Sequence, residues 1–332
     1  MLKCRSWALA TASLLASFVV GSSSAAVWED DFSSNPASRE WRVFGDASLF
    51  RWNATNKNFE VTWDSTRTNS YFFHPLGTIL AKDDDFSLAF DLRLVDIVGG
   101  VVPGRTGPFE IAIGFLHLAD ATNANFRRGT GGDSPNLVEF DYFPAGSYPD
   151  WGMTVDPTVS PTIISSNVQF ATGFTTPLEM TNRDSFRVTL SYAASNQTLV
   201  TTLLRNGQPF APVSNTVLTA SFTDFRVDAV SINSYSDAGD SFDSVLAHGV
   251  VDNLVVTVPD RPKLAGGFAE GFWRTRRTSR TNWTYLLERA TGLTNWTAVS
   301  ARLAGTGAAM SLTETNRPAG AAAFYRVRAD RP

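Results

Sequence analysis

The 332-residue chain has little of the chemistry on which many enzymes and metal sites depend. It contains one cysteine, Cys4, and three histidines, His74, His117 and His248. Because Cys4 precedes the apolar run at the N-terminus, the chain beyond it has no thiol for catalysis, disulfide bonding or metal binding. The histidines lack the close spacing of zinc ligands and give no basis for a Ser-His-Asp triad.

Long hydrophobic runs are also absent, except at the N-terminus. Residues 1–26 are predicted to be a secretion signal, with Lys3 and Arg5 before an apolar run at 7–20 and small residues at 24–26. No later stretch approaches the roughly 20 apolar residues of a membrane span, so we expect no transmembrane segment. We expect export to the extracellular space, the cell surface or the periplasm, and no nucleic-acid partner.

The composition is typical of an all-β protein with two modules of opposite charge. Hydrophobic residues make up 43% of the chain and charged residues 18%, with 24 glycines and 16 prolines. Residues 27–262 carry 15 Lys and Arg against 28 Asp and Glu, a net charge of −13, whereas residues 263–332 carry 11 against 4, a net charge of +7. Turn residues at 259–262 and 266–267 mark a linker. We predict a β-sandwich at 27–258, a linker at 259–267 and a small basic β module at 268–332.

Several segments alternate between apolar and polar residues, as half-buried strands do. Asn206-Gly207 follows one of them and predicts a hairpin. About 230 residues with roughly a dozen strands suit a large two-sheet sandwich. The expected strands are 86–94, 137–143, 186–192, 198–204, 227–233 and 249–258.

The segment 137–143 raises the functional question. With a side-chain period of two, Glu139 and Asp141 project from one face of this strand, and Val138, Phe140 and Tyr142 from the other. Neighbouring carboxylates repel, which raises a pKa unless a cation or a shared proton compensates.

Three interpretations of this pair remain open. The carboxylates, with oxygens of the next loop, can hold calcium, which takes six to eight oxygen ligands. They can instead be the acid and nucleophile of a glycosidase. The third interpretation is a solvated face of the sheet with no ligand.

The segments 109–116, 128–132 and 138–143 resemble a known family. The first is similar to a central strand of L-type (legume-type) lectins, the second to the glycine-containing loop that follows it, and Val-Glu-Phe-Asp-Tyr-Phe at 138–143 to their Val-Glu-Phe-Asp-Thr-Phe signature. The resemblance covers about residues 28–258. It implies a concanavalin A-like jelly-roll β-sandwich that binds a polysaccharide or a glycoconjugate.

The resemblance also implies metal ligands. Glu139 matches a transition-metal ligand, Asp141 a ligand shared with calcium, Phe143 a backbone carbonyl facing calcium, and Asp150 the downstream carboxylate. This chain has no asparagine at 144–149, and it has Trp151 and Gly152 where the family has a histidine. Calcium is therefore the expected cofactor.

Glycosidases of the same fold carry the motif Glu-x-Asp-x-x-Glu. Glu139 and Asp141 match its first two acids, but the third position is Pro144. A two-carboxylate mechanism needs a proton donor for the leaving oxygen. We therefore expect binding without catalytic residues, with an incomplete hydrolase or lyase as the alternative and a structural or adhesive surface protein as the third.

The loop after this strand supplies the predicted carbohydrate-binding residues. Tyr148 and Trp151 flank Asp150 in a polar, Pro- and Gly-containing segment. Their rings can stack on sugars, or they can pack the loop against the edge of the sandwich.

The C-terminal module has patterns of its own, at 285–296 and 324–327. Tyr285-Leu286-Leu287-Glu288-Arg289 and Phe324-Tyr325-Arg326-Val327 resemble small β modules on secreted proteins of Verrucomicrobia-type bacteria. Arginines at 274, 276, 277 and 280 form a basic cluster that can contact acidic glycans or a cell surface, or can simply be solvated. Cell-surface attachment through this module is the corresponding expectation.

Overall fold

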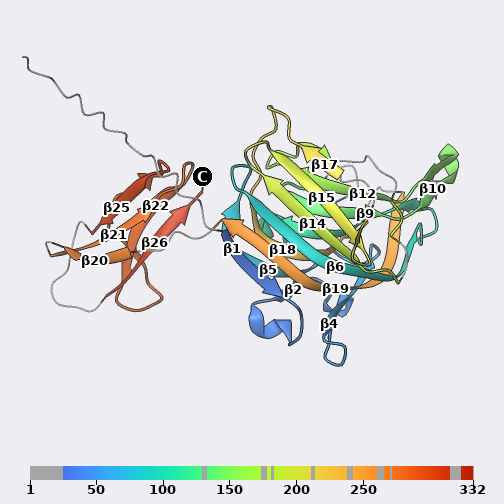
Figure 1. Ribbon diagram of the computed structural model, residues 1–332, viewed down its shortest axis with the longest axis horizontal. Helices are drawn as coiled ribbons and strands as arrows, with labels where there is room; N and C mark the ends of the chain where they lie inside the picture. The colour runs from blue at the N-terminus through green and yellow to red at the C-terminus, as the bar shows by residue number, and fades with distance from the viewer. Residues whose placement is uncertain are drawn as a thin grey trace, which may run out of the picture.

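The computed structural model describes residues 25–128, 133–172, 178–180, 183–210, 214–237, 242–259, 265–269, 271–314 and 323–331. They form a large β-sandwich and, beside it, a smaller β module (Figure 1). The predicted signal lies outside these residues except for its last two positions, 25 and 26. None of the helices among the described residues has both the length and the apolar character to cross a membrane.

The first layer of the sandwich is a ten-stranded sheet, antiparallel except where β7 meets β19. Its main path is β16 (Gln208–Pro209), β15 (Thr198–Arg205), β14 (Phe186–Ala193), β6 (Phe86–Gly99), β19 (Asp243–Pro259), β4 (Asn58–Asp64) and β3 (Phe50–Asn53). Three further strands pair with this path: β1 (Ala25–Asp30) and β7 (Gly107–Pro108) with β19, and β17 (Ser214–Val217) with β15.

The second layer is a seven-stranded antiparallel sheet. Its order is β13 (Phe170–Thr172), β12 (Thr158–Ile164), β9 (Leu137–Phe143), β8 (Ile111–Leu116), β18 (Val227–Ser234), β5 (Ser70–Leu80) and β2 (Arg42–Phe44). The predicted strand 137–143 coincides with β9, which lies near the middle of this sheet. The other predicted strands also fall on observed strands, some of which extend further, and β8 begins at Ile111, two residues after the start expected from the resemblance.

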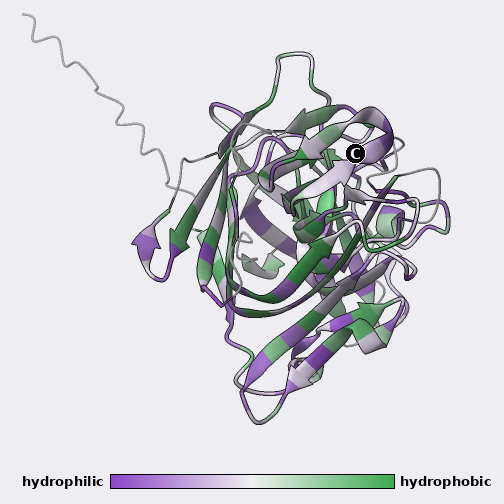
Figure 2. Ribbon diagram, turned by 90° about the vertical axis from the view of Figure 1, so that its right-hand side faces the viewer, coloured by the Kyte–Doolittle hydropathy of each residue, from purple (hydrophilic) through white to green (hydrophobic). Residues whose placement is uncertain are grey.

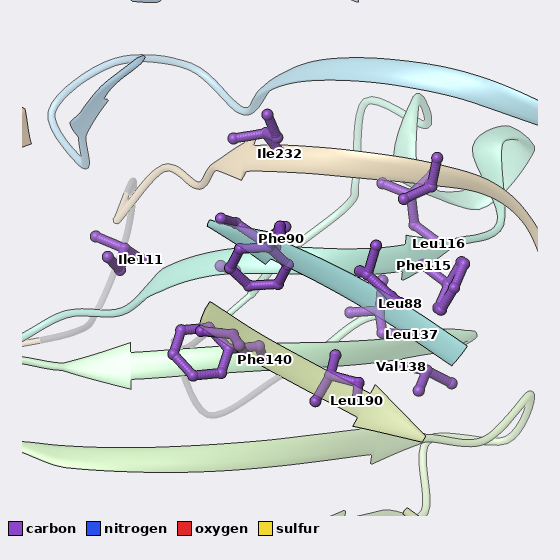
Figure 3. Close-up of a cluster of buried hydrophobic side chains, with 14 of the residues drawn as sticks. Leu88, Phe90, Ile111, Phe115, Leu116, Leu137, Val138, Phe140, Leu190 and Ile232 are labelled. Atoms are coloured by element: carbon purple, nitrogen blue, oxygen red, sulfur yellow. The ribbon is translucent and has the colours of Figure 1, made fainter. Parts of the chain in front are cut away.

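The core lies between the two sheets. Alternating residues of the strands face it, which gives the banded colouring of Figure 2. Phe90 of β6 and Phe140 of β9 meet across it in a T-shaped contact, with ring centroids 5.6 Å apart (Figure 3). Because Phe140 faces this core, Glu139 and Asp141 on the same strand point to the opposite side of the seven-stranded sheet.

Turns and short helices connect the strands. Asn206 and Gly207 both have positive φ, 51° and 79°, as the predicted Asn-Gly hairpin requires. A separate two-stranded hairpin follows β9 and consists of β10 (Gly146–Tyr148) and β11 (Met153–Val155). The described helices are η1 (Pro36–Arg39), η2 (Ala47–Leu49), α1 (Leu118–Ala121) and η3 (Pro149–Trp151).

The small module consists of two sheets with a core of their own. One has the order β20 (Ala265–Ala269), β21 (Phe272–Thr278) and β25 (Ala309–Thr313). The other has β22 (Thr284–Ala290) between β23 (Thr297–Ala298) and β24 (Leu303–Ala304), with β26 (Phe324–Asp330) also paired to β22. Within the expected linker 259–267, Pro259 ends β19 and residues 265–267 begin β20; residues 260–264 lie outside the described residues.

Candidate functional site

Glu139 and Asp141 are both fully buried, with exposed fractions of 0%. Small residues lie beside them on β8, where Gly114 pairs with Glu139 and Ala112 with Asp141. A Cβ on Gly114 would lie only 2.6 Å from the Glu139 Cα, so a glycine here leaves room for the acidic side chain. The interpretation of this pair as a solvated face is therefore wrong, because the face of β9 that carries the acids is covered.

The guanidinium group of Arg128 lies among these carboxylates. Its Nε donates to Glu139 Oε2 at 3.2 Å, and a terminal nitrogen donates to Asp141 Oδ2. The other terminal nitrogen lies 3.1 Å from Asp133 Oδ1 and 3.6 Å from Glu110 Oε1. The Arg128 side chain is itself 3% exposed, so the acids contact a buried cation from within the chain.

The hydrogen bonds in this cluster are unevenly distributed. Glu139 Oε1 accepts from Asn233 Nδ2 at 2.7 Å and from the Tyr235 hydroxyl. By contrast, both oxygens of Glu110 and Oδ1 of Asp141 are buried without a hydrogen-bond partner. A buried carboxylate oxygen without a partner favours the protonated form of the acid, because the ionised form is costly in the interior.

The pKa values follow from this arrangement. Burial raises the pKa of Glu110 to about 8, although Arg128 opposes the shift. Burial, followed by the charge of Asp141, raises the pKa of Glu139 to about 7. The pKa of Asp141 is also raised by burial. One guanidinium does not compensate three buried carboxyls, so near neutral pH the cluster retains a proton.

The expected calcium ligands are not brought together. Arg128 already places a cation between Glu139 and Asp141, whereas Asp150 is exposed on the β10–β11 hairpin and Phe143 pairs with Thr158 as the last residue of β9. No group of three or more His, Cys, Asp or Glu side chains in the described ranges is arranged to hold a metal ion. The residues present therefore do not fit calcium, and the calcium expectation stays a prediction that the geometry disfavours.

The same burial affects the enzyme alternative. A glycosidase acid must touch the glycosidic oxygen, and a nucleophile must touch the anomeric carbon. Glu139 and Asp141 have no exposed surface with which to do so, and Pro144 stands at the third motif position. These acids form a structural ion cluster and not an accessible catalytic pair.

The predicted carbohydrate-binding residues lie together on the hairpin. Tyr148 ends β10, Asp150 and Trp151 belong to η3, and Gly152 turns the chain into β11 with φ of 64°. The rings of Tyr148 and Trp151 stack with centroids 5.1 Å apart and planes 28° apart. Phe242 contacts Trp151 edge to face at 5.4 Å. We call Tyr148, Trp151 and Phe242 the aromatic hairpin site.

Tyr148 anchors this site to the sandwich. Its hydroxyl donates to Asp243 Oδ1 at 2.6 Å, and β7 lies directly beneath its ring. A Cβ at Gly107 of β7 would overlap both the Tyr148 ring and the Asp243 carboxylate, so only glycine permits this close approach. Trp151 thus stacks on the Tyr148 ring, which is held in place by its contact with Gly107 and by its hydrogen bond to Asp243.

The outer part of the site is open to solvent. Trp151 is 59% exposed and Phe242 is 52% exposed. Near the base of the hairpin, Pro144 and Ala145 line a cavity of about 540 Å³, together with Tyr142 and Glu179. Two large exposed rings in contact are a feature of ligand sites, and packing of the loop alone does not explain why Trp151 stays exposed.

Sequence reasoning found Tyr148 and Trp151 but missed Arg128 and Phe242. In the sequence, Arg128 stands only as the residue before a glycine-rich segment. Its neighbours in the chain do not predict that its side chain contacts the acids of β9. Phe242 is separated from Trp151 by about ninety residues along the chain, and the strand β19 that begins after it brings the two together.

No family model matches the chain, and no curated protein matches it by sequence. Several solved structures are similar. Peanut lectin with a nine-residue peptide has 14% identity over 70% of this chain and 98% of its own, with a TM-score of 0.42. Basic winged bean lectin with Tn-antigen has 10% identity over 71% and 100%, with a TM-score of 0.43.

An enzyme is also among these structures. Alginate lyase Aly36B has 13% identity, covers 69% of this chain and 96% of its own, and has a TM-score of 0.39. The all-β sandwich predicted from the sequence is confirmed by the two sheets of the chain itself. The resemblance of the C-terminal module to Verrucomicrobia-type modules stays a prediction.

Proposed function

We propose that this protein binds carbohydrate at the aromatic hairpin site. The observation that carries the proposal is the stack of Trp151 on Tyr148, with Trp151 59% exposed and Tyr148 fixed by Asp243. The C–H face of a pyranose ring is apolar and flat, so it can pack on an exposed indole, while its hydroxyls need polar partners at the edge. Asp150, exposed beside Trp151, is placed to accept from such hydroxyls.

The rigidity of the platform supports binding over catalysis. A side chain held in its bound conformation loses little entropy when a ligand arrives. Tyr148 has this preorganisation through its hydroxyl and the close approach of Gly107. The buried acids Glu139 and Asp141 offer no accessible acid and nucleophile, so the hydrolase alternative has no site in this cluster.

Export remains a proposal that rests on the N-terminal segment. If residues 1–26 direct secretion, the site would face polysaccharides or glycoconjugates outside the cell. The calcium requirement expected from the lectin resemblance is not part of this proposal, because the described residues do not fit the ion.

A glycan array tests the proposal, followed by calorimetric titration of the best oligosaccharide. Trp151→Ala should weaken binding by about tenfold or more, which corresponds to about 1.4 kcal/mol. Its melting temperature should stay close to that of the wild type, because Trp151 is largely exposed. Phe324→Ala is the matched control, since Phe324 is 50% exposed on β26 in the other module. Equal affinity of the wild type and Trp151→Ala would refute the proposal.

A further inference from the structure

The basic module is docked on an acidic turn of the sandwich. The Arg331 side chain is 1% exposed and pairs with Asp84 and, at 3.7 Å, with Asp83. Asn282 Nδ2 also donates to Asp83 Oδ2 at 2.9 Å. Ile79 of β5 packs against the core of the module. The opposite net charges of the two modules, visible in the sequence, therefore meet at a defined interface.

A cleft of about 580 Å³ lies along this interface. The wall from the sandwich includes Ile79 and Asp228, and the wall from the module includes Trp283, Tyr285, Arg277 and Arg280. Its volume falls within the range of sites for small organic ligands. The lining combines aromatic and aliphatic surface with two guanidinium groups, which a purely structural seam between modules does not need.

Arg277 is the unusual member of this lining. Its guanidinium lies over the Tyr285 ring at 4.5 Å, and its Nε is buried without a hydrogen-bond partner. No carboxylate among the described residues lies within 4.0 Å of it. Burial lowers its pKa, and nearby Arg280 adds to this effect. A half-buried guanidinium whose Nε lacks a hydrogen-bond partner, with no anion beside it, is a group that a ligand can satisfy.

A second guanidinium, that of Arg280, also lines the cleft. Its guanidinium lies 4.0 Å from Asp84 Oδ1, which is at the limit of an ion pair, and Asp84 is bound more closely by Arg331. Asp228 on the opposite wall is already engaged, since its Oδ1 accepts from the Leu118 backbone N–H at 2.8 Å. The cleft therefore combines two cations with one occupied acid.

We propose that this cleft binds a carboxylate-bearing saccharide, with Arg277 paired to the carboxylate. The planar guanidinium of arginine matches a carboxylate through two parallel N–H···O bonds. The apolar surface of Ile79 and Tyr285 accommodates the face of the sugar ring, and Asp228 Oδ2 provides an acceptor for a hydroxyl. This site is separate from the aromatic hairpin site, since strand β10 of the hairpin lies at the end of the sandwich away from the small module (Figure 1).

The test is a titration of the full chain with trigalacturonate and with its neutral analogue, trigalactose. Trigalacturonate should bind at least tenfold more tightly than trigalactose. Arg277→Gln should weaken the binding of trigalacturonate at least tenfold. Arg276→Gln is the matched control, because the neighbouring Arg276 lies on the opposite, exposed face of β21. Trp151→Ala should leave this binding unchanged, which separates the cleft from the proposed hairpin site.

Three results would overturn the proposal. The first is equal affinity for the two trisaccharides, and the second is equal loss in Arg277→Gln and Arg276→Gln, which would indicate a diffuse basic surface. The third is displacement of trigalacturonate by acetate at a comparable concentration, which would indicate a site for small anions. If Arg277→Gln does not fold, Arg280→Gln and Arg277→Lys decide instead: each should weaken trigalacturonate binding, and wild-type affinity in both would refute the site.

Discussion

The Nε of Arg128 lies 3.2 Å from Glu139 Oε2, in the interior of the protein, where the sequence left a metal ligand, a catalytic acid and a solvated carboxylate as alternatives. A guanidinium satisfies the same electrostatic need as a bound cation, but it does so from within the chain. The consequence is that the acidic strand β9 is stabilised without an external ligand. It also makes the stability of the sandwich depend on one arginine.

Arg128→Met should therefore destabilise the protein strongly. Removing one partner of a buried ion cluster leaves uncompensated charge, which typically costs about 3–5 kcal/mol. Urea unfolding followed by tryptophan fluorescence measures this loss. The matched control is Arg127→Met, since Arg127 is exposed beside Arg128 in the chain and should change the free energy of unfolding by less than about 0.5 kcal/mol. Equal stability of the two variants would contradict the assignment of Arg128 as the internal cation.

The raised pKa values of Glu110 and Glu139 predict a loss of stability at alkaline pH. Below about pH 4.5, the ordinary value, both carboxyls are protonated in the folded and unfolded states. As pH rises toward 8, the unfolded chain releases protons that the folded protein retains, so the free energy of unfolding falls. Above about pH 8 the contribution of the two groups is lost.

Glu110→Gln isolates this effect, because glutamine resembles the protonated acid in shape and charge. The difference in stability between this variant and the wild type should grow in favour of the variant between pH 5 and pH 9. Chemical unfolding at several pH values measures it. Glu29→Gln, at an exposed position of β1, should show no such trend. A pH-independent difference for Glu110→Gln would show that the proton is held elsewhere.

Calcium should not raise the melting temperature of the protein. A ligand that binds only the folded state stabilises it by mass action, so a calcium site would give a clear difference between added calcium and chelator. Because Arg128 already pairs with Glu139 and Asp141, we expect the two melting curves to coincide. A rise with calcium that disappears in Asp141→Asn would instead favour the metal loop implied by the lectin resemblance.

The strand β9 shows what the sequence could and could not predict. Alternation fixed its ends and placed Glu139 and Asp141 on one face, because the period of a strand is a local property. Whether that face is open or covered is not local. It depends on Arg128, whose side chain reaches Glu139, and on Asn233 and Tyr235, which belong to β18 and the residue after it.

The same limit applies to the two proposed binding sites. Tyr148 and Trp151 were predictable, since they are close in sequence within a polar loop. The role of Gly107 was not, because the contact with Tyr148 joins segments about forty residues apart. Within the arginine cluster, Arg276 and Arg277 are adjacent on β21, so their side chains lie on opposite faces of the strand. This separation could be predicted from the sequence. The opposite wall of the cleft could not be predicted, because it comes from residues of the sandwich that are distant from β21 in the sequence.

Gly107→Ala tests whether the aromatic hairpin site depends on its support. The added Cβ would overlap the Tyr148 ring and the Asp243 carboxylate, so Tyr148 must move and its 2.6 Å hydrogen bond to Asp243 must break. Trp151, which stacks on Tyr148, should then lose its fixed position. We expect about a tenfold loss of oligosaccharide affinity, or about 1.4 kcal/mol, although Gly107 itself need not touch the sugar.

The control for this variant is Gly267→Ala, because a Cβ at Gly267 meets nothing within 4 Å. Calorimetric titration of both variants with the oligosaccharide chosen on the array gives the comparison, and a shift in tryptophan fluorescence in Gly107→Ala alone would report the displacement of Trp151. If Gly107→Ala binds the oligosaccharide as tightly as Gly267→Ala while Trp151→Ala does not bind it, the indole contacts the sugar but does not need the Tyr148 anchor. The preorganisation argued for this site would then be wrong, and the affinity would come from Trp151 alone.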